Sequence, residues 1–332
     1  MKPVAKAMIA VSAILFTAGL AIGQWGGGGW GRNNDTSNGR SSIVYTEGHD
    51  AVDENTVRTA RETASHSTET PVWTNAPEFA QDVWTFTRIK YKYATGPKVS
   101  RSASHMGWIT DYPDSDLNLS FRVQQMTSIR TDPDARTIFL KDPDLLDFPW
   151  IYMVEVGRLA LRDEEVPILR KYILNGGVLM ADDFWGQMQW DTFEREIKRA
   201  LPEAEYRFEE LPMSHPLFHC VFDLKVPKNK LQTPNSRQGA RSLDPSDDMY
   251  GITWEINHDD YDNYDRMGRA AHDMHVRAIL DKKGRIMVIA THNCDNGDGW
   301  EREGEDDGFF HEFSEKRAFP LGINILFYVM TH

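Results

Sequence analysis

WIYMVEVGRLALRDEEVPILRKYILNGGVLMADDFWG, residues 150–186, reads as a strand, a helix and a second strand. Residues 151–154 and 178–181 are short apolar runs typical of buried strands. Between them, apolar residues recur at i, i+3 and i+7 from Val166, which indicates an amphipathic helix, and two glycines end it. Such a unit joins neighbouring parallel strands by a right-handed crossover. We therefore expect both strands to end at one edge of a sheet, where α/β folds bind their ligands.

Carboxylates stand at both of these strand ends. Glu155 follows the first strand, and Asp182 and Asp183 end the second. Adjacent strand residues point to opposite faces, so only one of the two aspartates faces a given crevice unless the strand has already ended. Grouped carboxylates raise one another's pKa and can form an acid/base pair, or they bind a divalent cation. Glu155, Asp182 and Asp183 are thus candidate catalytic residues, and Asp182 and Asp183 are candidate metal ligands. The alternative is that one aspartate caps the next helix and the other accepts backbone N–H groups.

Further binding candidates are expected at the same edge because each follows a predicted strand: Asp111, Tyr112, Trp185, Asn293, Trp300 and Glu301. The stretch 293–301 is rich in oxygen ligands, but its glycine and glutamate do not have the EF-hand spacing. A calcium site in an exported protein is one interpretation of this stretch, and a polar loop is the other. For Tyr112, the alternative to a binding role is packing.

The other predicted elements follow from periodicity. Alternation predicts a half-exposed strand over 87–93, and a capping-box-like pair, Asp191 and Glu194, predicts the start of a helix. Remaining predictions are a helix that starts within the acidic stretch 111–116 and includes Leu119, Val123 and Met126 on one face, a strand over 136–140, a hairpin over 276–290 and a buried helix over 321–330.

Composition bounds the class of protein. Of 332 residues, 40% are hydrophobic and 11% aromatic, which is enough for a sizeable core. The formal net charge is −13, and no cluster of Lys and Arg interrupts the acidic balance. Nucleic acids and anionic membranes are therefore not expected as partners.

The chain is predicted to have three parts. Residues 1–23 resemble a signal peptide, with Lys2 and Lys6 before an apolar run and small residues at a cleavage point. A membrane span is the alternative, but it needs about 20 apolar residues, and this run is shorter. Residues 24–83 are predicted to be a disordered Gly/Ser/Thr-rich linker, and residues 84–332 the folded domain. We thus expect an exported protein, periplasmic or extracellular, without a transmembrane span after signal cleavage.

Export would place the two cysteines, Cys220 and Cys294, in an oxidising compartment. A disulfide between them is one prediction, and burial as separate thiols is the other. The sequence does not show whether their Cα atoms come within bridging range.

Four motifs carry a resemblance to a known family. They are WITDYP (108–113), YILNGGVLMADD (172–183), HPLF (215–218) and GIN (322–324). Over about residues 84–331 the chain resembles the bacterial family labelled domain of unknown function 4159. The resemblance implies a fold similar to class I glutamine amidotransferases: a flavodoxin-like, open, mostly parallel α/β sheet with helices on both faces. It implies no activity.

Two hypotheses for the function follow. An amidotransferase needs a cysteine on a sharp strand–helix turn, and the candidate turn at 182–186 has none. The first hypothesis is therefore a non-catalytic binding or assembly module of the bacterial cell envelope, with an envelope protein or a small ligand as partner. The second is a carboxylate- or metal-dependent hydrolase acting on a sugar or a peptide-like substrate, with Glu155 as general acid or base. No cofactor beyond a divalent cation is indicated.

Overall fold

The structure, a computed structural model, describes residues 42–79, 82–93, 107–255 and 271–332. The predicted signal peptide lies outside these residues. Within them, the main sheet has the strand order β4-β3-β5-β6-β9-β8-β7. Its strands are β3 (Thr87–Lys90), β4 (Arg136–Phe139), β5 (Trp150–Val154), β6 (Val178–Asp182), β7 (Glu209–Glu210), β8 (His275–Leu280) and β9 (Ile286–His292). All neighbours from β4 to β9 pair in parallel, whereas β8 runs antiparallel to both β9 and β7. The sheet is therefore of the predicted open, mostly parallel, flavodoxin-like type.

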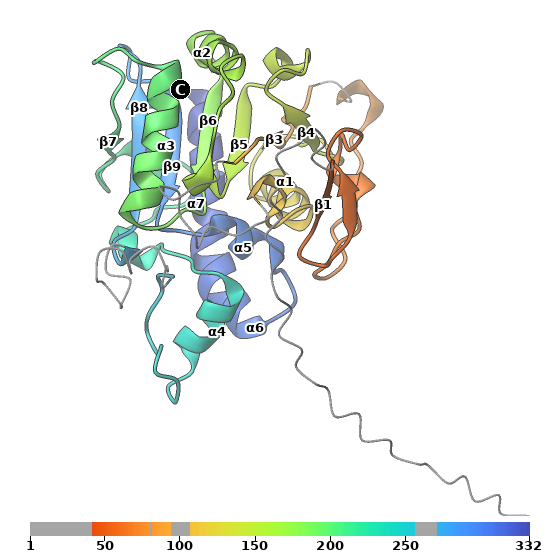
Figure 1. Ribbon diagram of the computed structural model, residues 1–332. Coiled ribbons are helices and arrows are strands. Elements are labelled where there is room, and N and C mark those ends of the chain that lie inside the picture. The colour runs from red at the N-terminus through yellow and green to blue at the C-terminus, as the bar shows by residue number, and fades with distance from the viewer. Residues whose placement is uncertain (1–41, 80–81, 94–106, 256–270) are drawn as a thin grey trace, which may run out of the picture. The chain divides into compact units, whose positions relative to one another are not determined.

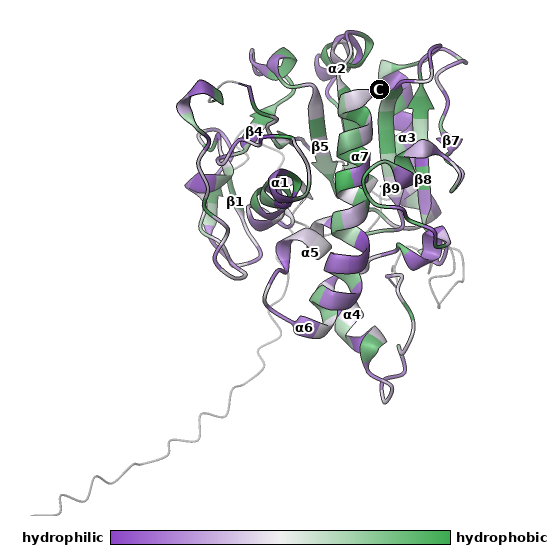
Figure 2. Ribbon diagram, turned by 180° about the vertical axis from the view of Figure 1, so that it is seen from behind, coloured by the Kyte–Doolittle hydropathy of each residue, from purple (hydrophilic) through white to green (hydrophobic). Residues whose placement is uncertain are grey.

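Helices lie on both faces of this sheet. Those over the faces are α1 (Asp114–Met126), α2 (Glu165–Leu174), α3 (Gly186–Ala200) and α7 (Phe319–Thr331), and a π-helical segment, η10 (Phe310–Ala318), leads into α7. The short helices α4 (Ser236–Leu243), α5 (Asn296–Glu301) and α6 (Asp307–Phe309) lie beyond the ends of the parallel strands (Figure 1). Figures 1 and 2 show α3 over one face and α7 over the other, and α2 packs beside α3 as α1 does beside α7. Among the helices of the described residues, none has both the length and the apolar character of a membrane span.

Short 3-10 helices occupy several connections. They are η1 (Ala60–Glu62), η2 (Pro77–Phe79), η3 (Gly107–Ile109), η4 (Leu145–Asp147), η5 (Val156–Arg158), η6 (Pro216–His219) and η7 (Lys228–Lys230). The η3 and η5 turns lie next to carboxylates at the end of the sheet, because η3 precedes Asp111 and η5 follows Glu155.

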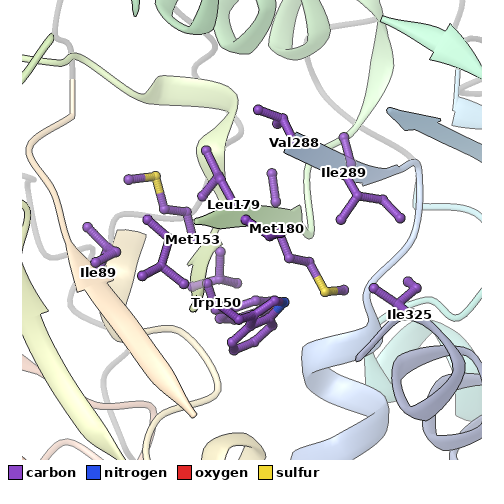
Figure 3. Packing of buried hydrophobic residues seen from close by; sticks show 14 of the residues in the cluster. Ile89, Trp150, Met153, Leu179, Met180, Val288, Ile289 and Ile325 are labelled. Atoms are coloured by element: carbon purple, nitrogen blue, oxygen red, sulfur yellow. The ribbon is translucent and has the colours of Figure 1, made fainter. Parts of the chain in front are cut away.

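The strand–helix–strand unit forms as predicted. β5 and β6 pair in parallel with Val154 opposite Asp182, and α2 connects them. Every residue of both strands is buried because helices cover both faces. Figure 3 shows neighbouring residues of β6 on opposite faces of the sheet, with Met180 on the side of Ile325 from α7 and Leu179 on the other side.

Two local predictions were wrong. The strand β3 is fully buried rather than half exposed, because it lies between β4 and β5 and its polar side chains find internal partners. Lys90, for example, donates from Nζ to the carbonyl of Val57 at 2.8 Å. The helix predicted from Asp191 begins at Gly186. Its first N–H is satisfied by Oδ1 of Asn293 at 2.8 Å, a long-range contact that replaces the expected capping box.

Residues 42–79, which we call the N-terminal arm, differ from the expected disordered linker. They contain the hairpin β1 (Ile43–Tyr45) and β2 (Ala51–Asp53). The arm also hydrogen-bonds to the edge strand β4, where the amide of Thr137 donates to the carbonyl of Arg58 at 2.8 Å. A polar composition predicted disorder, but a few buried apolar residues and the unpaired edge of a sheet suffice to hold the arm in place.

Candidate functional site

Residues at the carboxyl ends of the parallel strands adopt unusual backbone conformations. Asp111, Glu155, Asp183 and Asn293 have φ angles of 60°, 53°, 52° and 59°. This left-handed region costs a non-glycine residue on the order of 1–3 kcal/mol when the conformation is strained, and such residues concentrate at functional sites. Each of the four lies in the segment that follows a parallel strand, so the strain is gathered at the edge where α/β sheets bind ligands.

Asp182, the last residue of β6, has a structural role. Its carboxylate accepts hydrogen bonds from the amides of Asn296 and Gly297 at 2.9 and 3.1 Å, from the Asn296 side chain at 2.8 Å, and from the hydroxyls of Tyr152 and Thr291. Burial raises the pKa of Asp182 to about 6. These bonds fix the start of α5 against the end of β6, and Figure 1 shows α5 beyond the arrowheads of β5 and β6.

Asp183 points instead to a group of buried carboxylates. The carboxylate oxygens of Asp111, Asp183 and Asp295 lie within 4.8 Å of one another. Burial raises the pKa of Asp183 well above its usual value, and repulsion from Glu155 raises it further. The tips of β5 and β6 therefore meet at one edge as predicted, with Asp183 rather than Asp182 as the partner of Glu155.

The group continues along α5. Asp111 also belongs to a second set of three, with Asp298 and Glu301. We call Asp111, Asp183, Asp295, Asp298 and Glu301 the acidic cluster; each is at most 7% exposed. For Asp111, Asp295 and Glu301, burial raises the pKa well above the usual value, and repulsion between the members adds to it.

A buried arginine positions Asp111. Arg88, on β3, pairs with Asp116 and donates to the carbonyls of Trp108 and Thr110 at 2.9 and 2.8 Å. The segment just before Asp111 is therefore tied to the sheet. Asp116 is satisfied by this pair instead of capping α1.

The N-terminal arm reaches the far side of the acidic cluster. His66 places Nε2 3.1 Å from Glu301 and Nδ1 3.1 Å from Asp114, although the second contact lacks the alignment of a hydrogen bond. Arg302 forms ion pairs with Asp298, Glu301 and, from the arm, Glu47. The Asp298–Glu301 side thus already has basic partners.

Several predicted binding residues lie in the core. Tyr112 is buried and donates to the carbonyl of Thr59 at 2.8 Å, and the indole of Trp300 donates to the carbonyl of Ala318 at 2.9 Å. Asn293 holds the start of α3. Trp185 lies at the site, because its indole donates to Oδ1 of Asp183 at 2.9 Å, and Glu301 is part of the acidic cluster.

The thiols and the nearby histidine offer no nucleophile at this edge. Cys220 and Cys294 are free, so the alternative of separate thiols holds over the disulfide, and burial raises the pKa of Cys294 well above its usual value. His292 is buried and contacts the carbonyl of Gly186 through Nε2 at 2.9 Å. Burial lowers the pKa of His292 to about 3, helped by repulsion from Arg277 and His275.

Sequence reasoning missed four members of this neighbourhood: Glu47, His66, Asp295 and Asp298. Asp295 and Asp298 stand in the oxygen-rich stretch 293–301, so the signal was present, but the stretch forms the short helix α5 and its N-cap rather than a loop. The two arm residues carried no signal, because nothing local connects them to α5.

Fold and candidate site together define an open, mostly parallel α/β domain with buried carboxylates gathered at the carboxyl ends of its parallel strands. The chain belongs to the family described as "Domain of unknown function (DUF4159)", whose match covers residues 85–330. A search of curated proteins finds no match. The N-terminal arm precedes the family match, although it supplies side chains beside the acidic cluster.

Proposed function

We propose that this protein is an exported, non-catalytic binding module of the bacterial cell envelope that holds a cationic ligand at the acidic cluster. One observation carries the proposal. Oδ2 of Asp111 is buried and accepts no hydrogen bond from the described residues. A buried carboxylate without a donor is costly unless it is protonated or paired with a cation. A cationic ligand would remove that cost.

The distribution of basic side chains indicates where the ligand would bind. Arg302 pairs with the Asp298–Glu301 side of the acidic cluster. Within the described residues, neither Asp183 nor Asp295 forms an ion pair. Ionised carboxylates on that side would have no basic partner among the described residues, so a ligand cation has most to gain there.

Two features support a non-catalytic role in the envelope. The turn after β6 carries Asp183 where an amidotransferase would need its cysteine, and fold alone does not license a reaction. The predicted signal peptide over 1–23 supports export.

Thermal unfolding of the chelator-treated protein with CaCl₂ or spermidine added tests the proposal. At least one of these cations should raise the unfolding midpoint, because a ligand that binds only the folded state stabilises it. The shift should disappear in Asp111→Asn and persist in Asp248→Asn, which removes an exposed carboxylate outside the acidic cluster. If neither cation shifts the midpoint, the proposal is wrong.

A hydrolase is the second candidate, and the pairing of Glu155 with Asp183 favours it. Burial raises the pKa of Asp183, repulsion from Glu155 raises it further, and a carboxyl group kept protonated near neutral pH can act as a general acid. Glu155→Gln would then abolish release of product from sugar or peptide substrates while cation binding persists. Binding without turnover in the wild type would support the binding module instead.

A further inference from the structure

We propose that Asp111, Asp183 and Asp295 form a site for one hard divalent cation of the Ca²⁺ and Mg²⁺ class. The inference rests on the proposed function, because it names the ligand of the same edge. It also moves the expected metal site, which the sequence placed at Asp182 and Asp183, away from Asp182.

Three separate elements bring the ligands together. Asp111 follows η3, Asp183 follows β6, and Asp295 is the N-cap of α5. Each offers one carboxylate oxygen, and these oxygens lie within 4.8 Å of one another. That spacing allows a single ion to contact all three at the distances of roughly 2.0–2.6 Å that Mg²⁺ and Ca²⁺ prefer.

Each carboxylate keeps an oxygen available for the ion. Asp183 accepts the indole of Trp185 through Oδ1, and Asp295 accepts the amide of Asp298 through Oδ1 at 2.7 Å. These bonds orient the two side chains and leave Oδ2 of each without a hydrogen bond from the described residues. Asp111 is only 1% exposed, and its Oδ2 likewise accepts no hydrogen bond from the described residues. The lack of a donor for Oδ2 of Asp111 is an observation independent of the short distances between the three carboxylates. It indicates that a positively charged ligand belongs beside Asp111.

The ligand set selects the class of ion. All three donors are carboxylate oxygens, which favour hard cations such as Ca²⁺, Mg²⁺ and Mn²⁺. Zn²⁺ prefers sites that include histidine or cysteine. The nearest histidine of the arm, His66, belongs to a different group, with Glu47 and Glu301. Ca²⁺ or Mg²⁺ should therefore bind here more tightly than Zn²⁺.

Calorimetric titration of the full, chelator-treated chain with CaCl₂, MgCl₂ and ZnCl₂ tests the site. We expect one hard cation per chain, and a loss of affinity of at least about tenfold in Asp111→Asn, Asp183→Asn and Asp295→Asn. Asparagine retains the hydrogen bonds described above and is as good an N-cap as aspartate, so the variants should fold. Their circular dichroism and metal-free unfolding midpoints check this. Asp248→Asn should bind as the wild type does.

Trp185 provides a local readout. Tb³⁺ replaces Ca²⁺ at oxygen sites and emits when a nearby tryptophan is excited. Because the Trp185 indole lies 2.9 Å from Asp183, excitation of tryptophan should sensitise bound Tb³⁺. Ca²⁺ should displace the signal, and Trp185→Phe should weaken the emission. Emission that does not depend on Asp183 would place the ion elsewhere.

The outcomes separate this inference from the proposed function. If spermidine binds in a manner that depends on Asp111 but no hard divalent cation binds, the metal site is wrong and the binding module stands. If neither binds, both are wrong. If Zn²⁺ alone binds, or if the three asparagine variants bind Ca²⁺ and Mg²⁺ as the wild type does, the metal site is again overturned.

Discussion

Replacement of Asp182 by alanine, compared with asparagine, isolates the hydrogen bonds that hold α5 at the end of β6. Both variants remove the same charge. Asparagine keeps a carbonyl oxygen for the amides of Asn296 and Gly297. The Asn296 side chain can then turn so that its own Oδ1, buried and without a partner in the described residues, accepts from the new amide. Thr291 can donate to the carbonyl of Ala181, 3.2 Å away. We expect Asp182→Asn to lie within about 1 kcal/mol of the wild type.

Alanine offers no such acceptor. It leaves three buried N–H donors without a partner: two backbone amides and the side-chain amide of Asn296. A buried unsatisfied donor costs roughly 1–3 kcal/mol, so with three such donors Asp182→Ala should be less stable than Asp182→Asn by at least about 3 kcal/mol. Asp183→Ala loses only the bond from Trp185 and relieves repulsion, so its unfolding free energy should stay within about 1 kcal/mol of the wild type or rise.

Urea unfolding in chelator at neutral pH measures these differences, provided that the slope with denaturant is the same for all variants. Excess chelator is needed because a bound cation would stabilise the wild type and the Asp182 variants but not Asp183→Ala. The reasoning is refuted if Asp182→Ala is as stable as Asp182→Asn, or if Asp183→Ala is as damaging as Asp182→Ala.

Three further predictions concern other parts of the site. Because burial lowers the pKa of His292 from 6.5 to about 3, the unfolded chain takes up a proton first as the pH falls. The unfolding free energy should thus drop by about 3 kcal/mol between pH 6.5 and about pH 4, and urea unfolding of His292→Gln should lack this part. Gly297→Ala would place a Cβ 1.9 Å from Oδ2 of Asp111, so Tb³⁺ affinity should fall; unchanged affinity would contradict the proposed geometry. Arg302→Gln should speed hydrogen exchange across residues 42–79 and spare the main sheet, whereas a uniform increase would indicate global destabilisation.

Predictions based on local periodicity were confirmed where the pattern was long and strong. Three predicted parts appear at their expected positions: the strand–helix–strand unit of β5, α2 and β6, the hairpin of β8 and β9, and the helix α7. Errors arose where a distant contact replaced a local rule. The helix α3 begins early because Asn293, the residue after β9, caps it, and β3 is buried because the arm and α1 supply partners for its charged residues.

The candidate site was predicted in part. The expectation that Glu155 and the Asp182–Asp183 pair share one edge followed from the crossover rule, which depends only on chain connectivity. The assignment of roles within the pair did not follow, because it depends on which side chain meets the amides at the start of α5. A strand that has just ended no longer alternates, and the left-handed backbone at Asp183 redirects its side chain.

The sequence by itself determined the α/β class, the strand–helix–strand unit and the acidic edge, because hydrophobic period and chain order are local properties. Only the tertiary structure decided that Asp111, Asp183 and Asp295 meet, and that the N-terminal arm reaches Glu301 of the acidic cluster through His66. These groups come from segments up to 235 residues apart, such as His66 and Glu301. Their convergence is set by register and by packing across the sheet, which no local pattern encodes.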